Sequence, residues 1–276
     1  MNYFDLRKKN EEQFKQSGID ELADIDWIMV EVLGIKRSML PFVKEISGKD
    51  QEKIMSAVQR RVKHIPLDYI FGKSYFYGYE FKVDRNVLIP RQDTEILVEN
   101  IIKDIKSKNK PVKVLDIGTG SGAIIVTIKK ETNAECYAVD VSKKALEIAK
   151  YNAEQNNAKV EFIESNLFEN VPKIKFDYIV SNPPYIESDV ISTLQAEVRF
   201  NEPILALDGG VDGLDFYRKI INQSTDYLTS SGKIYFEIGY NQAEIVKNLL
   251  ENDYSQIQVY KDYGGNDRVI VAQIKK

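Results

Sequence analysis

Short apolar runs alternate with amphipathic segments from residue 112 onward, and this alternation constrains the fold more than any other feature of the 276-residue sequence. The apolar runs that we expect to form strands lie at 113–117, 136–140, 159–165, 176–182 and 233–238. The segments with helical spacing lie at 123–130, 145–152, 215–228 and 242–250. Strands that alternate with helices are typical of βαβ units. The sequence therefore predicts an α/β domain built on a parallel sheet.

Two further β-like runs, at 255–263 and 268–274, lie near the end of the chain on either side of Gly264 and Gly265. Runs joined by so short a glycine turn favour an antiparallel pair. We expect this pair at the edge of the sheet.

The first part of the chain has a different pattern. Apolar residues at helical spacing, such as Leu22 and Ile25, predict a small helical domain over residues 1–74. The segment 75–90 is aromatic and β-branched with a glycine near its middle, which predicts a β-hairpin linker. The larger domain would then occupy 91–276.

Composition narrows the class of protein. Hydrophobic residues make up 43% and charged residues 29%, as in an ordinary globular protein, and no apolar run approaches the roughly 18 residues of a membrane span. The start of the chain lacks the apolar core of a signal peptide, so we expect a cytoplasmic protein with no membrane partner. The single cysteine, Cys136, fits a reducing compartment, where it is favoured as a core residue.

Charge and histidine content exclude several functions. The single histidine, His64, cannot provide a histidine-centred acid–base pair or a histidine-rich metal site. A net charge of -4 argues against a large surface for the phosphate backbone, so we expect no stable nucleic-acid binding. A protein or small-molecule substrate is favoured.

A glycine-rich turn follows the first predicted strand, and its residues are Gly118, Thr119, Gly120, Ser121 and Gly122. Glycines at a strand-to-helix turn let the backbone approach a ligand closely, and the following helix offers free N–H groups. The turn predicts a nucleotide-like ligand. The same spacing also fits a dinucleotide site or a purely structural turn.

Three residues at the ends of the next strands extend this predicted site. Asp140 ends the second strand, where its carboxylate can accept hydrogen bonds from both hydroxyls of an adenosine ribose. Helix capping is the alternative role for this residue. Asn166 and Leu167 follow the third strand, where an adenine edge would lie if the strands are ordered as in a methyltransferase. These assignments leave NAD open as the ligand.

The turn Asn182, Pro183, Pro184 and Tyr185 directly follows the fourth strand and carries the chemical prediction. Prolines lack an N–H and fix the turn, so its carbonyl groups have few competing donors. The Asn182 side-chain oxygen and the Pro183 carbonyl can together accept the two N–H bonds of a primary amide or an exocyclic amine, and Tyr185 can stack on the planar group.

Such a turn suits methyl transfer to nitrogen. Holding both N–H bonds directs the nitrogen lobe toward a methyl donor, and the acceptors stabilise positive charge as it develops. No general base is required beforehand, because the nitrogen becomes acidic only after methylation. An isolated tetrapeptide of this kind is as often a structural turn, but its place after a glycine-rich loop and a ribose-type aspartate favours the functional interpretation.

Several motifs together resemble the HemK/PrmC family of release factor glutamine methyltransferases. The matching segments are IPLDYIFGKSYFYGYEF (65–81), VLIPRQDTEILVE (87–99), VLDIGTGSGAI (114–124), AVDVSKKALEIAKYNA (138–153), IVSNPPYI (179–186), VRFNEPILALDGGVDGLDFYRKI (198–220) and KDYGGNDRV (261–269). The N-P-P-Y turn is shared with adenine and cytosine amino-methyltransferases. Its combination with the other segments is much narrower.

The resemblance implies a Rossmann-like, seven-stranded class I methyltransferase domain, joined by the hairpin to a helical domain that docks the release factor. It further implies that S-adenosylmethionine donates the methyl group, leaving S-adenosylhomocysteine, and that the acceptor is the side-chain amide of the glutamine in a Gly-Gly-Gln loop. By position, Gly118, Gly120 and Gly122 would line the methionine end, and Asn182 to Tyr185 would clasp the amide.

The sequence departs from the family pattern at two positions. Asn166 stands where the family usually has an acidic residue, so a hydrogen bond to the adenine amino group would lack charge assistance. Gln92 replaces a common proline, which loosens that loop.

An acidic group lies in the segment after residue 207 and consists of Asp208, Asp212 and Asp215. These residues are favoured as loop and helix-cap residues, so we expect no metal.

An amino-methyltransferase acting on adenine or cytosine of nucleic acid is the alternative function, since it uses the same turn on a flipped or single-stranded base.

Overall fold

The computed structural model describes residues 1–108 and 110–276 and divides them into two compact units. The N-terminal unit comprises Met1–Gly72 together with Gln195–Asn201, and the sheet unit comprises Lys73–Leu194 and Glu202–Lys276. The first unit ends after Gly72, two residues before the domain boundary predicted at residue 74. Residues 195–201 lie in the N-terminal unit, whereas the sequence predicts them in the larger domain. In the described part of the chain, no helix has the length and apolar character that a membrane span requires.

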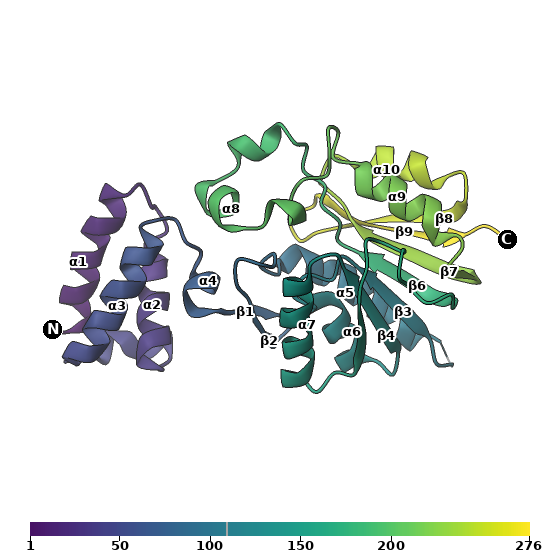
Figure 1. Cartoon of the computed structure of the whole chain (residues 1–276). Helices are drawn as coiled ribbons and strands as arrows, with labels where there is room; N and C mark the ends of the chain where they lie inside the picture. The colour runs from purple at the N-terminus through teal and green to yellow at the C-terminus, as the bar shows by residue number, and fades with distance from the viewer. Residues whose placement is uncertain (109) are drawn as a thin grey trace. The chain divides into compact units, whose positions relative to one another are not determined.

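Helices form the N-terminal unit (Figure 1). They are α1 (Tyr3–Gln16), α2 (Ala23–Leu33), the 3-10 helix η1 (Arg37–Phe42), α3 (Gly48–Arg61), α4 (Leu67–Phe71) and α8 (Ala196–Asn201). Buried apolar residues spaced by three or four, such as Ile25, Ile28 and Met29 of α2, form the core of the unit. The predicted helical character of this part is confirmed.

A buried arginine joins α8 to the other helices of this unit. Arg61 is 2% exposed, and its guanidinium contacts Asp24 at 2.7 Å and Glu197 at 2.5 Å. The Asn201 side chain also donates to the His64 carbonyl at 2.9 Å. Charge pairing and a side-chain hydrogen bond therefore hold α8 within the N-terminal unit.

The predicted β-hairpin is present and belongs to the sheet unit. It consists of β1 (Lys73–Phe76) and β2 (Tyr79–Lys82), which pair antiparallel. Tyr77 and Gly78 both have positive φ, and the Tyr77 amide donates to Glu95 of the following helix at 2.7 Å. The hairpin is shorter than the predicted range 75–90.

A seven-stranded sheet forms the centre of this unit (Figure 1). Its strands are β3 (Lys113–Ile117), β4 (Glu135–Asp140), β5 (Val160–Glu164), β6 (Phe176–Ser181), β7 (Leu228–Glu237), β8 (Tyr254–Lys261) and β9 (Asp267–Ile274). The order is β5-β4-β3-β6-β7-β9-β8, with the first five strands parallel and β9 antiparallel to both of its neighbours. The predicted Rossmann-like fold and the antiparallel terminal pair are confirmed.

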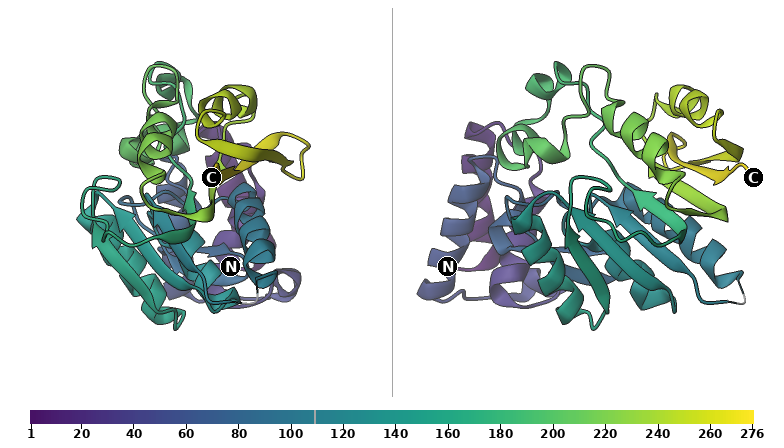
Figure 2. Two further views of the ribbon diagram at one scale, coloured as in Figure 1. Left: turned by 90° about the vertical axis from the view of Figure 1, so that its right-hand side faces the viewer. Right: turned by 45° about the vertical axis from the view of Figure 1, so that its right-hand side comes forward.

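Helices cover both faces of the sheet (Figures 1 and 2). They are α5 (Gln92–Lys106), α6 (Ala123–Glu131) and α7 (Lys143–Gln155) on one face, and α9 (Asp215–Ser224) and α10 (Ala243–Leu250) on the other. Successive strand residues point to opposite faces, so Val114 packs in the first layer and Leu115 in the second. Cys136 is buried in the first layer, as expected for a core residue.

The predicted boundary between the helix at 215–228 and the strand at 233–238 is wrong. The helix predicted over 215–228 ends at Ser224, and Leu228 instead begins β7. Leu228 is buried in the second core layer, where its parallel partner on β6 is Phe176. Pairing across the sheet therefore overrides the helical spacing of the apolar residues.

Candidate cofactor and amide site

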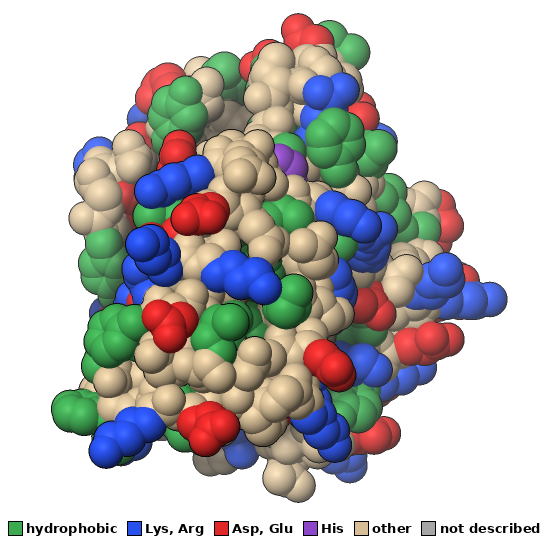
Figure 3. Space-filling model, turned by 90° about the vertical axis from the view of Figure 1, so that its left-hand side faces the viewer, with side chains coloured by type: hydrophobic (Ala, Val, Ile, Leu, Met, Phe, Trp, Pro, Cys, Tyr) green, Lys and Arg blue, Asp and Glu red, His purple; other side chains and the backbone are tan. Residues whose placement is uncertain are grey.

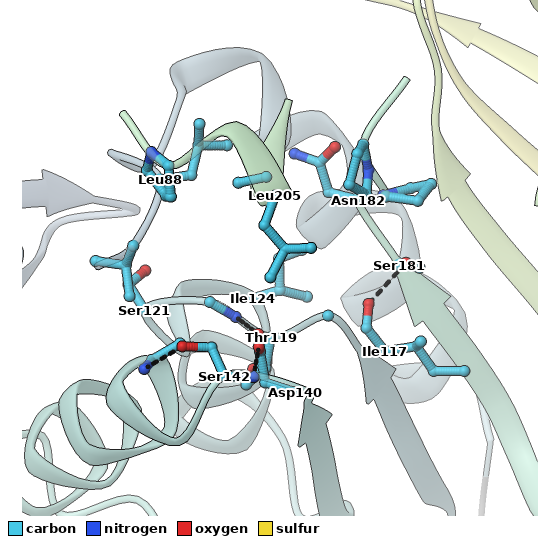
Figure 4. A pocket seen from close by; sticks show the side chains of 18 of the residues that line it. Leu88, Ile117, Thr119, Ser121, Ile124, Asp140, Ser142, Ser181, Asn182 and Leu205 are labelled. Atoms are coloured by element: carbon cyan, nitrogen blue, oxygen red, sulfur yellow. Dashed lines mark hydrogen bonds between the residues drawn. The ribbon is translucent and has the colours of Figure 1, made fainter. Parts of the chain in front are cut away.

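A pocket of about 280 Å³ lies at the carboxyl ends of the parallel strands, close to the lower end of the roughly 300–1,000 Å³ typical of small-molecule sites. Four strand ends contribute part of its lining, namely Ile117–Ser121, Asp140–Ser142, Ser165–Leu167 and Ser181–Pro184. In Figure 4, Asp140 lies at the bottom near Thr119, whereas Leu88 and Leu205 lie at the top and Asn182 at the upper right. Ligands of open α/β sheets bind at this edge.

The glycine-rich turn bends around the ligand side of this pocket. Gly118 and Gly120 have φ of 73° and 54°, and a Cβ on either residue would meet no protein atom within 4 Å. Glycine is therefore required at these positions by the positive φ, which it adopts readily, and not by a lack of space. Both residues line the pocket, together with Thr119 and Ser121. Ligand binding by this loop stays a prediction.

Gly122 has a different surrounding. It precedes α6 with a φ of 82°, and a Cβ there would lie 3.2 Å from the Cβ of Ala149 on α7. It is absent from the lining that the described residues give this pocket. The third glycine of the turn thus permits close packing of α6 against α7.

Asp140 connects the glycine loop to the second strand. Its carboxylate accepts from the Gly120 amide and from the Ser142 amide, both at 2.8 Å. The N-cap of α7 is Ser142, whose Oγ accepts from the Ala145 amide. Asp140 is thus not the N-cap residue. Each carboxylate oxygen has lone pairs beyond these two bonds, and burial raises the pKa of the group while the backbone donors lower it.

A second carboxylate lies beneath the loop. Asp116 is fully buried, and its Oδ2 accepts from the Thr119 hydroxyl at 2.7 Å. Its Oδ1 has no hydrogen-bond partner in the described part of the chain. Burial raises the pKa of Asp116 to about 7, against the lowering effect of Thr119 and with a smaller contribution from Asp140. Asp116 was missed from the sequence, although it lies two residues before the first glycine.

The loop after β5 supplies Asn166 and Leu167. Both line the pocket, and Leu167 has a positive φ of 50° that is stabilised where the Ser165 hydroxyl donates to its carbonyl. The Asn166 amide donates to Glu169 at 2.8 Å, which leaves the Asn166 oxygen as an acceptor. An acceptor at this place suits the amino group of an adenine.

The turn after β6 forms the opposite wall. Asn182, Pro183 and Pro184 line the pocket, and the Asn182 side-chain nitrogen lies 3.4 Å from the Thr94 hydroxyl of α5. With the amide nitrogen directed to Thr94, no described residue donates to the Asn182 side-chain oxygen. The predicted acceptor therefore remains available to a ligand. Thr94, which is buried and also lines the pocket, was not singled out from the sequence.

Tyr185 turns away from the pocket lining. Its hydroxyl donates to Glu237 at 3.4 Å, and its ring packs against the second core layer. Its carbonyl accepts from the Gln242 side chain at 3.0 Å. The structure thus places Tyr185 behind the turn, and stacking on a bound amide stays a prediction.

The segment 207–214, which contains three glycines, packs against the same turn. Gly209 donates to the Ile186 carbonyl at 2.8 Å, and a Cβ on Gly209 would lie 2.7 Å from the Tyr185 Cα and 2.8 Å from the Pro184 carbonyl. A Cβ on Gly213 would overlap the Tyr185 carbonyl. These contacts leave room only for glycine, so the segment 207–214 and the turn form one packed element.

An ion pair links two other segments of the lining. Arg91 contacts Glu202 at 2.5 Å, and the Glu202 side chain is 1% exposed. Arg91 belongs to the segment before α5, and Glu202 directly precedes the lining residues Pro203, Leu205 and Ala206. The pair therefore fixes the apolar side of the pocket.

The acidic group of the following loop has hydrogen-bond partners of its own. Asp208 accepts from Ser188 and from the Gly210 amide, and Asp212 pairs with Arg218 and accepts from the Leu214 amide. These contacts place Asp208 and Asp212 in the loop, as predicted, but the N-cap of α9 is Leu214 and no side chain caps the helix, so the predicted capping role is wrong. Within residues 1–108 and 110–276, no three histidine, cysteine or acidic side chains gather as a metal site would require.

Comparison with known proteins identifies the family. Residues 91–210 match the Methyltransferase small domain, and residues 5–72 match the PrmC N-terminal domain. The chain is 43% identical to the release factor glutamine methyltransferase of Fusobacterium nucleatum, over 98% of this chain and 78% of that protein. It is 37% identical to the protein of the same name from Bacillus subtilis, over 99% of this chain and 98% of that protein.

Solved structures agree on the fold. A methyltransferase from Pyrococcus furiosus superposes with a TM-score of 0.55 at 20% identity, covering 73% of this chain and 91% of that chain. At this identity the likeness concerns the fold alone. The sequence matches extend over both units, so the chain belongs to the release factor glutamine methyltransferase family.

Proposed function

We propose that this protein transfers a methyl group from S-adenosylmethionine to the side-chain amide nitrogen of the glutamine in the Gly-Gly-Gln loop of peptide-chain release factors. The observation that carries the proposal is the turn at Asn182–Pro184, which presents an unengaged amide oxygen in the pocket that Asp140 and the glycine loop also line. The relatives with this name match the chain over nearly its full length.

The lining residues fit the cofactor. Asp140 keeps acceptor capacity for ribose hydroxyls, and the open space above Gly118 and Gly120 admits a ligand against the backbone. Asn166 offers an acceptor to the adenine amino group, and Leu167 offers an apolar contact. When bound, S-adenosylmethionine supplies a methyl group activated by its sulfonium centre.

The amide is held by the turn. The Asn182 side-chain oxygen and the Pro183 carbonyl accept hydrogen bonds from its two N–H groups. This arrangement directs the lone-pair lobe of the amide nitrogen toward the methyl group. An amide nitrogen is a weak nucleophile, and the same acceptors stabilise positive charge as the nitrogen becomes methylated. The proton passes to solvent water after transfer, when the nitrogen has become acidic, and S-adenosylhomocysteine is the other product.

We assign docking of the release factor to the N-terminal unit. Phe4, Trp27, Met39 and Phe42 of this unit are large apolar side chains that lie exposed, and such residues often anchor protein interfaces. The face in Figure 3 carries hydrophobic side chains between positive and negative ones, without one extended basic field. A mixed surface suits a protein partner better than a phosphate backbone. Since release factors act in translation, we place the reaction in the cytoplasm.

Mass spectrometry tests the proposal. Purified release factor is incubated with the protein and isotopically labelled S-adenosylmethionine, and the modified residue is located by fragmentation. We expect one methyl group on the glutamine, and none on a release factor that carries alanine there. Single-stranded DNA and RNA are tested in parallel. Labelling of a nucleic acid in place of the release factor would contradict the proposal and favour the amino-methyltransferase alternative.

A further inference from the structure

Glu237 lies at the carboxyl end of β7, beside the turn that begins with Asn182. Strands β6 and β7 pair in parallel with Ser181 opposite Phe236, so the residues that follow them, Asn182 and Glu237, are neighbours at one edge of the sheet. We propose that Glu237 is a positioning residue that fixes the turn Asn182–Tyr185 in the geometry that binds the substrate amide. This inference rests on the amide-binding role proposed for that turn.

Glu237 contacts the turn at its far end. The Tyr185 hydroxyl donates to Glu237 Oε1 at 3.4 Å, and the Tyr185 carbonyl is held by Gln242 at 3.0 Å. The tyrosine is thus fixed through its side chain and its backbone at once. Loss of the carboxylate would release the side chain alone.

Glu237 also reaches the near end of the turn. The Thr94 hydroxyl, which lies 3.4 Å from the Asn182 side-chain nitrogen, is also hydrogen-bonded to the Glu237 carboxyl group. The contact with Thr94 orients the Asn182 side-chain amide so that its nitrogen faces Thr94 and its oxygen stays available as an acceptor. One buried carboxylate therefore stands behind both the acceptor residue and the tyrosine of the turn.

Stability does not account for this carboxylate. Glu237 is 1% exposed, and its Oε2 has no hydrogen-bond partner in the part of the chain that the structure describes. Burial raises the pKa of Glu237 to about 7, against smaller lowering effects of Thr94 and Arg268, and Arg268 is itself bonded to Asp262 and to the Ile238 carbonyl. A buried, partly unsatisfied carboxylate costs folding free energy, and an apolar residue of similar size is often the more stable choice. A role in holding the turn explains the carboxylate better.

Two substitutions at this position test the inference. Glu237→Leu keeps the volume and removes the acceptor, and we expect it to lower kcat by about tenfold or more while KM for release factor and the affinity for S-adenosylmethionine change less than about threefold. Glu237→Gln retains an acceptor and should keep kcat within about threefold of the unsubstituted protein. An unchanged kcat in the leucine variant overturns the inference, as does an equal loss in both variants.

A double-mutant cycle with Tyr185→Phe tests the route and does not require that Glu237→Leu fold well. Tyr185→Phe removes the hydroxyl that meets the carboxylate, so we expect it to lower kcat, and Glu237→Gln should cost no more in its presence than alone. A wild-type kcat for Tyr185→Phe contradicts the contact as the means of positioning.

Crystal structures separate this inference from the proposed function. We expect the turn Asn182–Tyr185 to be displaced in Glu237→Leu and retained in Glu237→Gln, whichever substrate the enzyme uses. If the unsubstituted protein failed to methylate release factor, the proposed function would fall, and the position of the turn would still decide the inference. An undisturbed turn in the leucine variant overturns it.

Discussion

Two aspartates lie at the glycine-rich loop, and their surroundings assign them different tasks. Asp140 lines the pocket and has acceptor capacity beyond its two backbone bonds, whereas Asp116 lies beneath the loop and bonds Thr119. The first aspartate is recognisable in the sequence because it ends a strand 20 residues after a loop glycine. The second reads as part of an apolar strand, so only its burial reveals it.

Asp140→Ala should weaken S-adenosylmethionine binding by about 1.5–3 kcal/mol, because a charged acceptor for two hydroxyls is lost. Isothermal titration measures this change. Ser142→Ala provides the comparison, since it removes the actual N-cap of α7 and should cost about 1 kcal/mol of folding free energy with a smaller effect on affinity. Unchanged affinity in Asp140→Ala would restrict Asp140 to a structural role.

Asp116 predicts a pH dependence of stability. Its pKa is raised from 3.8 to about 7, so between these values the folded protein holds a proton that the unfolded chain has lost. Stability from this group therefore falls as pH rises through that range. Relative to Asp116→Asn, the unsubstituted protein should lose on the order of 3 kcal/mol between pH 5 and pH 8. Urea unfolding of both proteins checks this, and parallel pH profiles would contradict it.

Asn182 separates an acceptor role from a turn role. Asn182→Ala removes the acceptor and should lower kcat/KM by about 100-fold or more, or about 2.7 kcal/mol of transition-state stabilisation. Asn182→Asp keeps an oxygen in place but loses the amide donor to Thr94, and the loss in kcat/KM should be distinctly smaller than for alanine. Methylation rates with separate cofactor titrations provide the measurement. Equal, mild losses would return Asn182 to a structural role.

At the scale of elements, the segment 207–214 and the Asn182–Tyr185 turn act as one piece. Gly209→Ala would force its Cβ to within 2.7 Å of the Tyr185 Cα, so we expect a loss of about 1–3 kcal/mol in stability and a loss of turnover. Gly48→Ala is the matched control, because its Cβ meets no atom within 4 Å and its φ is ordinary. Normal turnover in Gly209→Ala would show that the turn tolerates displacement.

The sequence predicts elements well where a local signal is strong. The strand at 113–117 matches its prediction because a lysine and a glycine bound an apolar run. The prediction for the end of α9 was wrong because Leu228 fits both a helical and a strand pattern until its pairing with β6 is known. The short helices between residues 190 and 206 were not predicted, since they are six residues long or fewer, which is too short for a repeated amphipathic pattern.

At the scale of the whole molecule, the N-terminal unit should control substrate choice and leave cofactor binding alone. Removal of residues 1–72 should retain S-adenosylmethionine affinity and methylation of a short Gly-Gly-Gln peptide. Methylation of intact release factor should drop by about tenfold or more, or about 1.4 kcal/mol of docking energy. Steady-state rates on both substrates measure this. Equal losses on peptide and protein would contradict a docking role.

Long-range pairing limits what the sequence can show at this scale. The fold class follows from alternating patterns, but Thr94 and Glu237 become neighbours of Asn182 only through the order and register of the strands. The assignment of 195–201 to the N-terminal unit likewise depends on contacts with Arg61 and His64, and no local pattern carries them.

The insertion of α8 into the N-terminal unit has a consequence for biosynthesis. His64 and Asn201 are 137 positions apart, so their contact closes a long loop at a cost that grows with the logarithm of its length. On the ribosome, the first helices emerge long before the segment that carries Glu197. Arg61 therefore lacks its contact with Glu197 until the segment 195–201 has left the exit tunnel, and the first unit to be synthesised cannot be the first to be finished.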